Sequence, residues 1–470
     1  MRLTHRVPAT SRSDRSASPG PKDVFQVVRP LRPPRSPGPT SAGSPSAGPD
    51  RRLRLHEWRD PAILATGALA AAAGFAQFGA TSALADVARS FGKPSPTGTS
   101  VAAEVGLSFT VLGVGLGTIR LAALGSLPLA ALADRVGRRR MMLGCTALGL
   151  AVTALAALSP SYWWFVALFA LGRPLLAGTN AISGVIAAEE TRSRDRAKAI
   201  ALVTAAWGGG TGLIAVVRGV AGPALSWRGL FGLTLIPLAA LPLLSRRLEE
   251  PDRFERIRGA AGVAVARSRH LLGRAPAALR RRLWLICLLI TMLGFVTGPA
   301  NALLFVYSES VLGLPRLETA GMVVAAGILG LGGLVAGRWA ADRLGRRVTA
   351  GISQAVIALA AMLTYSGSAA AAIAGYLLAV VAASVFAPAI GALAAELFPT
   401  GIRATVAGWM SVAGVLGAVS GLVLFGVLVS ALDDFVVAAA VVALPVLAVS
   451  PLYARFPETQ GMELEESAPD

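Results

Sequence analysis

The segment Ala130–Arg140 reads AALADRVGRRR, a strongly basic turn placed between two long apolar stretches. A shorter copy, AADRLGRR, occupies Ala340–Arg347, where it again separates two apolar stretches. Aligning Asp134 with Asp342 gives an offset of 208 residues between the two copies. The chain therefore repeats a distinctive element after a little less than half of its length.

A second, unrelated pattern repeats at nearly the same offset. In each half a glutamate precedes an arginine by seven residues: Glu189 precedes Arg196, and Glu396 precedes Arg403. The two glutamates are 207 residues apart. Two unlike motifs that share one period indicate a chain built from two related halves.

The composition is that of a membrane protein. Of the 470 residues, 54% are hydrophobic and 15% are charged, whereas an average soluble domain carries about 25% charged residues. Apolar stretches repeatedly reach the roughly 20 residues that span a bilayer, which argues against one large soluble core. The net charge of +18 does not indicate a nucleic-acid partner, because the arginines lie in short loops between apolar stretches, as the positive-inside rule describes.

The cysteines and histidines do not form a pattern that supports catalysis. Cys145 and Cys287 both fall within apolar stretches, so we expect neither a disulfide framework nor a metal site. His5, His56 and His270 lie outside those stretches and form no ligand cluster. Because no nucleophile–base set is visible either, we expect a protein that is not an enzyme and needs no cofactor.

We predict an all-α integral membrane protein with twelve transmembrane helices in two pseudo-symmetric six-helix bundles, because backbone groups in lipid must pair within their own segment. The predicted helices of the first bundle are 61–84, 107–132, 141–159, 162–187, 198–221 and 229–245. Those of the second bundle are 283–307, 319–340, 348–367, 370–394, 404–430 and 434–453.

The bundles are predicted to occupy 59–245 and 283–455. Residues 1–58 are rich in Pro, Ser, Gly and Arg and contain no apolar stretch, so we expect a disordered basic tail and no cleaved signal peptide. That tail either has no role or contacts anionic lipid. The cytoplasmic linker 246–282 holds eleven Arg and four acidic residues; it either sets topology or forms amphipathic surface helices. A C-terminal cytoplasmic tail occupies 456–470.

The basic loops predict the orientation in the membrane. They are 134–140, 192–198, 246–282 and 342–347, and the loops of the other face carry few basic residues. The basic face is therefore expected to be cytoplasmic in a cell-membrane protein, with both termini on that side because the number of spans is even.

The Asp-Arg-x-Gly-Arg turn has a physical logic of its own. Gly137 and Gly345 supply the backbone freedom for a sharp reversal between two helices. A carboxylate at the membrane face, such as Asp134, is costly unless it is paired or sits at a helix N-terminus. Such a charge pair can act as a conformational latch, or the residues can simply fix topology.

At these residues the chain resembles the major facilitator superfamily. The family's signature between its second and third helices is Gly-x-Leu-Ala-Asp-Arg-x-Gly-Arg-Arg, and this chain matches it from Leu132 to Arg139, with Ala130 in place of the leading Gly. The resemblance implies that the signature gates inward-open and outward-open states. The residues to which we extend a gating role are Asp134, Arg135, Gly137, Arg138, Glu189, Arg196, Asp342, Arg343, Gly345, Arg346, Glu396 and Arg403.

Three stretches resemble the sugar-porter and metabolite branch of that family. Glu396–Arg403 (ELFPTGIR) resembles its Glu-x-Phe-Pro-x-x-x-Arg, and Trp227-Arg228 resembles its Trp-Arg pair. Phe456–Glu466 (FPETQGMELEE) resembles its C-terminal Pro-Glu-Thr-x-Gly signature. The resemblance implies a cytoplasmic network of ion pairs that breaks when the transporter opens.

The chain departs from the branch where sugar binding is concentrated. Phe295 and Val296 stand where sugar-binding members have two Gln, and Gly391 stands where they have a Trp. A hexose needs convergent hydrogen-bond partners and an aromatic platform, so we do not expect one as substrate. Gln77 replaces the Asp of proton-coupled relatives and does not titrate, which weakens proton symport through this position.

Three arginines lie within predicted helices away from the cytoplasmic ends of those helices. Arg120 and Arg173 are well inside, Arg218 is nearer the outer end, and the nearest acids are also toward the outer ends. An intramembrane Arg costs at least about 2.5–3.5 kcal/mol on insertion scales, so it faces a cavity or a partner. Arg120 and Arg173 either attract an anionic substrate or bond backbone carbonyls or outer carboxylates. The substrate-binding candidates are Gln77, Arg120, Arg173, Asn180, Trp207 and Asn301.

We therefore predict a secondary active or facilitative transporter of a small organic solute, not a hexose, with an anion favoured if the arginines face the cavity. An alternative is a multidrug or metabolite efflux proton antiporter, since Gly219–Pro223 partly resembles the antiporter motif. A third is a transporter-like sensor, which the short C-terminal tail disfavours. The expected partners are the solute, protons in a coupled mechanism, and membrane lipid, with a monomeric chain and no nucleic acid.

Overall fold

The computed structural model describes residues 60–92, 105–191, 193–248, 277–399 and 402–459. The chain divides into two units, Met1–Leu53 and Arg54–Asp470, and every described residue belongs to the second. The predicted basic tail, most of the predicted linker and the last eleven residues lie outside the described part of the chain.

The described residues contain no strand and form twelve helices long and apolar enough to cross a membrane, which confirms the predicted all-α fold. The elements of the first half are α1 (Pro61–Ser82), α2 (Leu84–Phe91), α4 (Phe109–Ala122), the 3-10 turn η2 (Ala123–Gly125), α5 (Ser126–Val136), α6 (Arg138–Ala156), α7 (Tyr162–Glu190), α8 (Ser193–Ala221), η3 (Gly222–Ala224), α9 (Trp227–Gly232) and α10 (Leu235–Ser245). Three spans of this half consist of more than one element: α4, η2 and α5 form one, α8 and η3 form another, and α9 and α10 form the last of the half.

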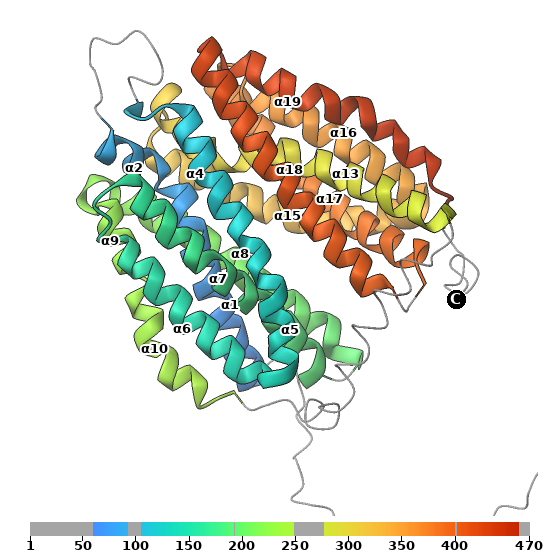
Figure 1. The fold of residues 1–470 in the computed structure, drawn as a ribbon, viewed down its shortest axis with the longest axis horizontal. Helices are drawn as coiled ribbons and strands as arrows, with labels where there is room; N and C mark the ends of the chain where they lie inside the picture. The colour runs from blue at the N-terminus through green and yellow to red at the C-terminus, as the bar shows by residue number, and fades with distance from the viewer. Residues whose placement is uncertain (1–59, 93–104, 192, 249–276, 400–401, 460–470) are drawn as a thin grey trace, which may run out of the picture. The chain divides into compact units, whose positions relative to one another are not determined.

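The second half repeats this order. Its elements are α13 (Ala277–Ala302), α14 (Leu304–Val306), the π-helical turn η4 (Tyr307–Val311), α15 (Arg316–Leu344), α16 (Arg346–Thr364), α17 (Ala369–Leu397), α18 (Arg403–Leu432), α19 (Phe435–Val449) and η5 (Ser450–Arg455). In Figure 1 the blue-to-green helices form one bundle and the yellow-to-red helices form the other.

The basic turns mark one end of the bundles, which we call the basic end; the other is the opposite end. Gly137 joins α5 to α6 with φ 120°, and Gly345 joins α15 to α16 with φ 96°. These are backbone conformations that glycine adopts at little cost, as the sequence predicted. Serine side chains cap four helices that begin at the opposite end, accepting a hydrogen bond from a first-turn N–H. The capping residues are Ser108, Ser161, Ser226 and Ser368.

Glycines let helices approach closely within each bundle. A methyl group on Gly210 of α8 would overlap the carbonyl oxygen of Ala71 in α1. In the second bundle a methyl group on Gly417 of α18 would overlap the carbonyl oxygen of Thr291 in α13. Small residues at such crossings allow the dispersion contacts that hold helices together in lipid. The two glycines occupy equivalent places, so the repeat extends to the packing.

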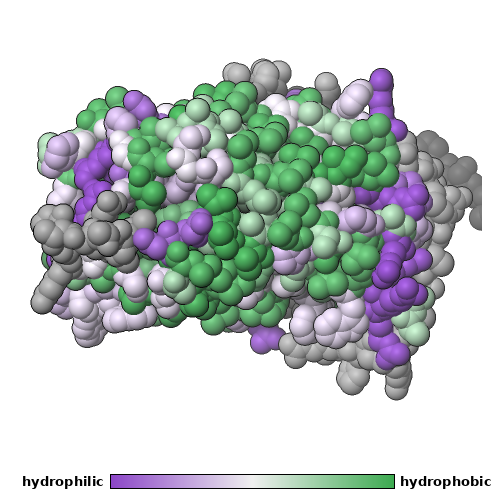
Figure 2. Space-filling model, turned by 90° about the horizontal axis from the view of Figure 1, so that it is seen from above, coloured by the Kyte–Doolittle hydropathy of each residue, from purple (hydrophilic) through white to green (hydrophobic). Residues whose placement is uncertain are grey.

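The surface has the distribution that a bilayer requires. Figure 2 shows, on one face, a broad band of hydrophobic residues between hydrophilic residues at both ends. Large apolar side chains are exposed along the spans, among them Leu155, Val220, Trp284 and Val335. Lipid would cover such a band, since a soluble monomer rarely exposes so large an apolar patch.

The two bundles contact each other along two seams, α4 with α18 and α8 with α15. In both seams the helices are closest together at the opposite end and lie further apart toward the basic end. Along α8 a methyl group on Gly219 would lie 2.8 Å from Cβ of Ala320, one on Gly212 would lie 4.0 Å from Val324, and one on Gly208 would meet no atom within 4 Å. The bundles therefore diverge toward the basic end.

Candidate functional site

A cavity of about 290 Å³ lies between the two bundles. The first bundle contributes Arg120 at the end of α4, Ala123 of η2 and Arg173 of α7. The second bundle contributes residues of α13 and α18: Ile290, Leu293, Gly294, Thr297, Met410, Ser411, Gly414, Val415 and Ala418. We call this space the central cavity, and its two walls differ sharply in charge.

The structure brings Arg120 and Arg173 together on one wall of the central cavity. Arg173 donates one hydrogen bond, from Nη1 to the backbone carbonyl of Gln77 at 3.4 Å, and its Nε is buried without a partner. Both guanidiniums carry a positive charge and line the same cavity, so they repel each other. No carboxylate occurs among the residues that line this cavity. Two cations thus share a partly desolvated space, and none of the described residues that line it supplies a counter-charge.

A second cavity of about 330 Å³ lies inside the second bundle. Thr297 lines both cavities, so the two spaces are neighbours. Asn301 lines the second one, and its Nδ2 donates to the carbonyl of Thr297 at 2.9 Å. Three hydroxyl groups also line this cavity: α16 contributes that of Thr364, and α17 contributes those of Tyr376 and Ser384. This space offers uncharged hydrogen-bonding groups beside the charged one.

The remaining predicted binding residues are less directly placed. The side chain of Gln77 is buried, with its Nε2 unpartnered, and its backbone carbonyl meets Arg173. The indole N–H of Trp207 is also buried without a partner, and the backbone of Trp207 packs against Gly74. Asn180 is partly buried in α7. None of these three lines the two cavities described above.

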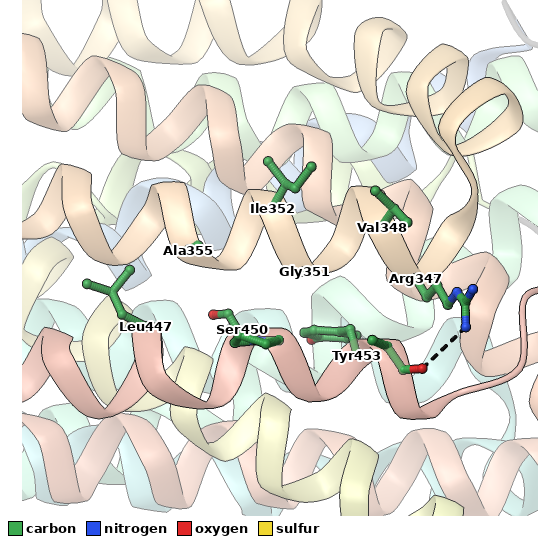
Figure 3. A pocket seen from close by; sticks show the side chains of 10 residues that line it. Arg347, Val348, Gly351, Ile352, Ala355, Leu447, Ser450 and Tyr453 are labelled. Atoms are coloured by element: carbon green, nitrogen blue, oxygen red, sulfur yellow. Dashed lines mark hydrogen bonds between the residues drawn. The ribbon is translucent and has the colours of Figure 1, made fainter.

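A third cavity of about 370 Å³ lies between α16 and the last helical segment, α19 with η5 (Figure 3). Its lining is mostly apolar, with Val348, Ile352 and Leu447 among the contributing residues. Its one guanidinium, Arg347, donates to the carbonyl of Ala454 at 3.2 Å. Since that charge is already engaged and all its walls belong to one bundle, this groove is a poor candidate for a solute site.

Charged residues tie the bundles together at the opposite end. Arg218 of α8 forms two hydrogen bonds to Glu309 of η4, at 2.5 and 2.6 Å, and one to Asp86 of α2 at 2.9 Å. Arg316 of α15 approaches the other oxygen of Asp86 at 2.5 Å. We call these four residues the cross-bundle network. Arg218 and Glu309 are almost fully buried, each with 3% of its side chain exposed.

Aromatic contacts accompany the cross-bundle network. Phe78 of α1 meets Phe305 of α14 edge-on, with ring centroids 5.8 Å apart, and the guanidinium of Arg218 lies over Phe305. Beside the α4–α18 seam, Phe109 of α4 meets Phe435 of α19 edge-on, with ring centroids 5.1 Å apart. Edge-on aromatic pairs add about 0.5–1.5 kcal/mol beyond their buried area. The opposite end is therefore closed by apolar contacts as well as by charge.

Two tyrosines between the spans support this closure from within the second bundle. Burial raises the pKa of both Tyr307 and Tyr365 above its ordinary value, so both hydroxyls stay neutral. The hydroxyl of Tyr365 donates to the carbonyl of Pro299 at 2.9 Å, and that of Tyr307 accepts from the N–H of Gly367. The ring of Tyr307 packs on Phe435, which connects these bonds to the seam.

At the basic end of the first bundle, Arg138 is the centre of the predicted gating motif. It pairs with Asp134 of its own turn at 3.2 Å and with Glu189 at the end of α7. Arg135 is exposed. Arg196 is predicted to belong to the same network, and its side chain lies outside the described part of the structure.

The second bundle repeats the arrangement at equivalent positions. Arg346 pairs with Asp342 at 3.5 Å and with Glu396 at 3.2 Å. Arg343 is exposed and lies over the ring of Trp339. Arg403, which the motif spacing connects to Glu396, instead donates from Nε to the carbonyl of Phe398 at 2.9 Å. The ion pairs described at the basic end thus lie within one bundle or the other.

Sequence reasoning did not single out the next arginine of each turn. Arg139 donates to the carbonyls of Ser245 and Leu248 at 3.0 and 2.7 Å. Arg347 donates to the carbonyls of Ala454 and Phe456 at 3.2 and 2.9 Å. Both therefore bind carbonyls at the end of their bundle's last helix, and the repeat of the Arg-Arg pair was the signal that could have identified them.

The C-terminal signature joins this network. The carboxylate of Glu458 accepts from the backbone N–H of Arg346 at 3.0 Å and pairs with Arg347 at 3.3 Å. The hydroxyl of Thr459 donates to Glu396. The Pro-Glu-Thr segment thus ties the last helix to the basic turn of the same bundle.

Comparisons with known proteins agree with this architecture. The sequence matches the family described as Major Facilitator Superfamily over residues 64–341 and 317–469. A probable 4-methylmuconolactone transporter of Cupriavidus pinatubonensis is 28% identical over 316 residues, which cover 65% of this chain and 72% of the relative.

Two solved structures share the fold. A xylose transporter from E. coli, in an inward-open conformation, has a TM-score of 0.67 at 18% identity and covers 86% of this chain and 98% of its own. A point mutant of the nucleoside transporter NupG has a TM-score of 0.69 at 12% identity, with coverage of 84% and 99%. Twelve spans, a repeated half and a family match over most of the sequence agree: this chain belongs to the Major Facilitator Superfamily and is a multi-pass membrane transporter of small solutes, not an enzyme.

Proposed function

We propose that this transporter moves a small organic anion, not a hexose, by alternating access through the central cavity. The observation that carries the proposal is the pair Arg120 and Arg173 on one wall of that cavity, with no carboxylate in its lining. Guanidinium groups bind carboxylates through two parallel hydrogen bonds, which gives both affinity and orientation. An anion would supply the counter-charge that the cavity lacks.

The departures from the sugar-binding pattern support a different substrate. Phe295 and Val296 offer no polar side-chain group where sugar-binding members have two glutamines, and Val296 is buried. Gly391 would meet no atom within 4 Å if it carried a methyl group, so no aromatic platform fills that position. The neighbouring cavity with Asn301 and Tyr376 could accept the uncharged end of the solute.

The name of one relative points the same way. A probable 4-methylmuconolactone transporter is 28% identical to this chain, and 4-methylmuconolactone joins a small lactone ring to a carboxylate. We infer a substrate of this chemistry: one carboxylate for Arg120 and Arg173, and a compact ring with hydrogen-bond acceptors for the cavity beside them.

The contacts at the two ends of the bundles support alternating access as the mechanism. The cross-bundle network and the aromatic contacts close the opposite end, while the ion pairs described at the basic end stay within single bundles. We infer a conformation open at the basic end, in which solute reaches Arg120 and Arg173 from that side. The reverse state would break the cross-bundle network and bring the gating residues of the basic turns together.

The proposal is tested by uptake of 4-methylmuconolactone into proteoliposomes that contain the full-length protein. Arg173→Gln and Arg120→Gln should each raise the KM for uptake about 10- to 100-fold, because a hydrogen bond to a charged group contributes about 1.5–3 kcal/mol. Arg455→Gln, which removes an exposed arginine outside the cavity, is the control. Unchanged KM in both cavity variants would remove the two arginines from the binding site.

A second candidate, efflux of apolar compounds, draws on the other wall of the central cavity. Ile290, Leu293, Met410 and Val415 make that wall largely apolar, and Met adapts to varied ligand shapes. Under this alternative, deleting the protein would raise sensitivity to several unrelated drugs. The variants Arg120→Gln and Arg173→Gln would then retain efflux.

The oligomeric state, the orientation in the membrane and the domain boundaries are also proposed. We propose a monomer in the cell membrane with both termini in the cytoplasm, bundles that occupy 59–245 and 283–455, and a cytoplasmic linker over 246–282. Fusing a reporter enzyme, active only in the cytoplasm, to positions 245 and 470 tests the orientation. Activity at both positions is expected, and inactivity at either contradicts it.

A further inference from the structure

We propose that the transporter is an anion exchanger, in which the anion-loaded protein changes conformation readily and the empty protein does so much more slowly. This inference rests on the proposed anion site. It adds that movement of one anion in one direction is coupled to movement of a second anion in the other. It follows from where the charges of the central cavity lie and from what must cover them.

Among the described residues that line the central cavity, the charged ones lie on the wall made by the first bundle. They are Arg120 and Arg173, from α4 and α7. The facing wall, from α13 and α18, is apolar except for the hydroxyls of Thr297 and Ser411. In the state open at the basic end, water entering between the bundles can solvate both guanidiniums.

Closure removes that water. To alternate, the protein must pass through a state closed at both ends, in which the apolar wall lies over the two arginines. Burying an uncompensated charge is expensive, and two like charges also repel one another. A bound anion offsets much of this cost, because its carboxylate neutralises one charge and accepts hydrogen bonds from both groups. The barrier to closure is therefore lower with an anion bound.

No group described within the membrane-spanning core can replace that anion. The carboxylates of the described residues lie near the two ends of the helices, as Asp86 and Glu309 do at one end and Asp134 and Glu396 at the other. None of the described residues is a histidine. A proton would add to the positive charge rather than neutralise it. The return step thus requires a second anion.

The test compares exchange with net uptake. Proteoliposomes of the full-length protein are given radiolabelled 4-methylmuconolactone, either unloaded or preloaded with the unlabelled compound, and binding is followed separately by the rise in melting temperature of the purified protein. We expect uptake into preloaded vesicles to be at least about tenfold faster. Equal rates with clear binding would overturn exchange and leave the anion site standing. Absence of both binding and uptake would overturn the proposed function and this inference with it.

A charge variant distinguishes exchange from a general loss of activity. Arg120→Gln halves the charge that closure must bury, so the ratio of exchange to net uptake should fall several-fold, even though the affinity drops. Arg120→Lys keeps the charge and should keep the ratio. If Arg120→Gln is not recovered in the membrane, Arg173→Gln makes the same test. A ratio that stays unchanged when either charge is removed contradicts the proposal, since weaker binding alone slows both processes.

Discussion

The two ends of the bundles use the same kinds of residue in different ways. At the opposite end, Arg218 and Glu309 come from different bundles and are almost fully buried, with 3% of each side chain exposed. At the basic end, Arg138 and Arg346 each pair within their own bundle, and Asp134 and Asp342 are half exposed, at 50% and 58%. One set of charges holds the bundles together, and the other holds each bundle's own turn in place.

This difference bears on the alternating access proposed for the two bundles. Because the described basic-end pairs repeat in both halves, each bundle supplies both partners of the pairs that are described at its own turn. The ion pairs described at the basic end include no copy of the cross-bundle network, so under the proposed alternating access this network would favour closure at the opposite end. Breaking it should shift the equilibrium, whereas breaking a basic-end pair should chiefly loosen one bundle.

The largest expected effect follows from removing Arg218. Arg218→Ala leaves Glu309 buried and unpaired, which costs about 3–5 kcal/mol and should favour the state open at the opposite end. The measurement is labelling of Ala320→Cys by a membrane-impermeant maleimide, in a protein whose Cys145 and Cys287 are replaced by Ser. Ala320 is buried against Gly219, so its labelling should rise sharply when that seam opens.

The control variant removes Arg89, which also contacts the other bundle at the opposite end but has an exposed side chain. Arg89 donates to the hydroxyl of Ser310 at 2.9 Å, and Arg89→Ala should change labelling little, because exposed polar contacts contribute about 0–1 kcal/mol. Equal labelling in the Arg89 and Arg218 variants would show that the cross-bundle network does not hold this end closed.

A smaller effect is expected from overpacking the α4–α18 seam. A methyl group on Gly113 would lie 2.5 Å from the carbonyl oxygen of Leu422, whereas one on Gly117 would make an ordinary contact, 3.5 Å from Val419. Gly113→Ala should therefore cost the closed seam about 1–3 kcal/mol, and Gly117→Ala should cost little. Labelling of Ala320→Cys again reports the shift. The comparison fails if Gly117→Ala opens the seam as much as Gly113→Ala does.

The smallest effects are expected at the basic end. Arg138→Gln and Arg346→Gln each break partly exposed pairs within one bundle, so each should lower stability by about 1 kcal/mol and leave Ala320→Cys buried. Thermal unfolding of the purified variants measures the first effect, and maleimide labelling measures the second. A large rise in labelling would mean that the basic-end residues, too, act between the bundles in this conformation.

The sequence predicted most of the fold because a bilayer leaves few choices. Each apolar stretch had to be a helix, so twelve spans could be placed within a few residues, and the glycines at 137 and 345 marked the two sharp turns. The repeated motifs predicted that Glu189 and Glu396 belong to a network of ion pairs, but not that their partners would be Arg138 and Arg346 of the basic turns. The predicted binding roles stay predictions.

The opposite-end contacts were not predictable in the same way. Asp86, Arg218, Glu309 and Arg316 are separated by up to 230 residues, and they have no shared spacing or repeated motif. Their meeting depends on how the bundles tilt, which periodicity does not encode. The two cavities depend on the same tilt, and this is why Arg120 and Arg173 could be singled out as costly charges but not assigned to one wall.

The most direct test of this account measures both ends at once. Spin labels at Leu132 and Trp409 report the distance between bundles at the basic end, and labels at Ser90 and Leu317 report it at the opposite end; all four side chains are exposed. Pulsed electron–electron double resonance should find a long distance at the basic end and a short one at the opposite end, and Arg218→Ala should reverse both. If the variant widens one end without narrowing the other, or moves neither, the bundles do not alternate about the central cavity as described.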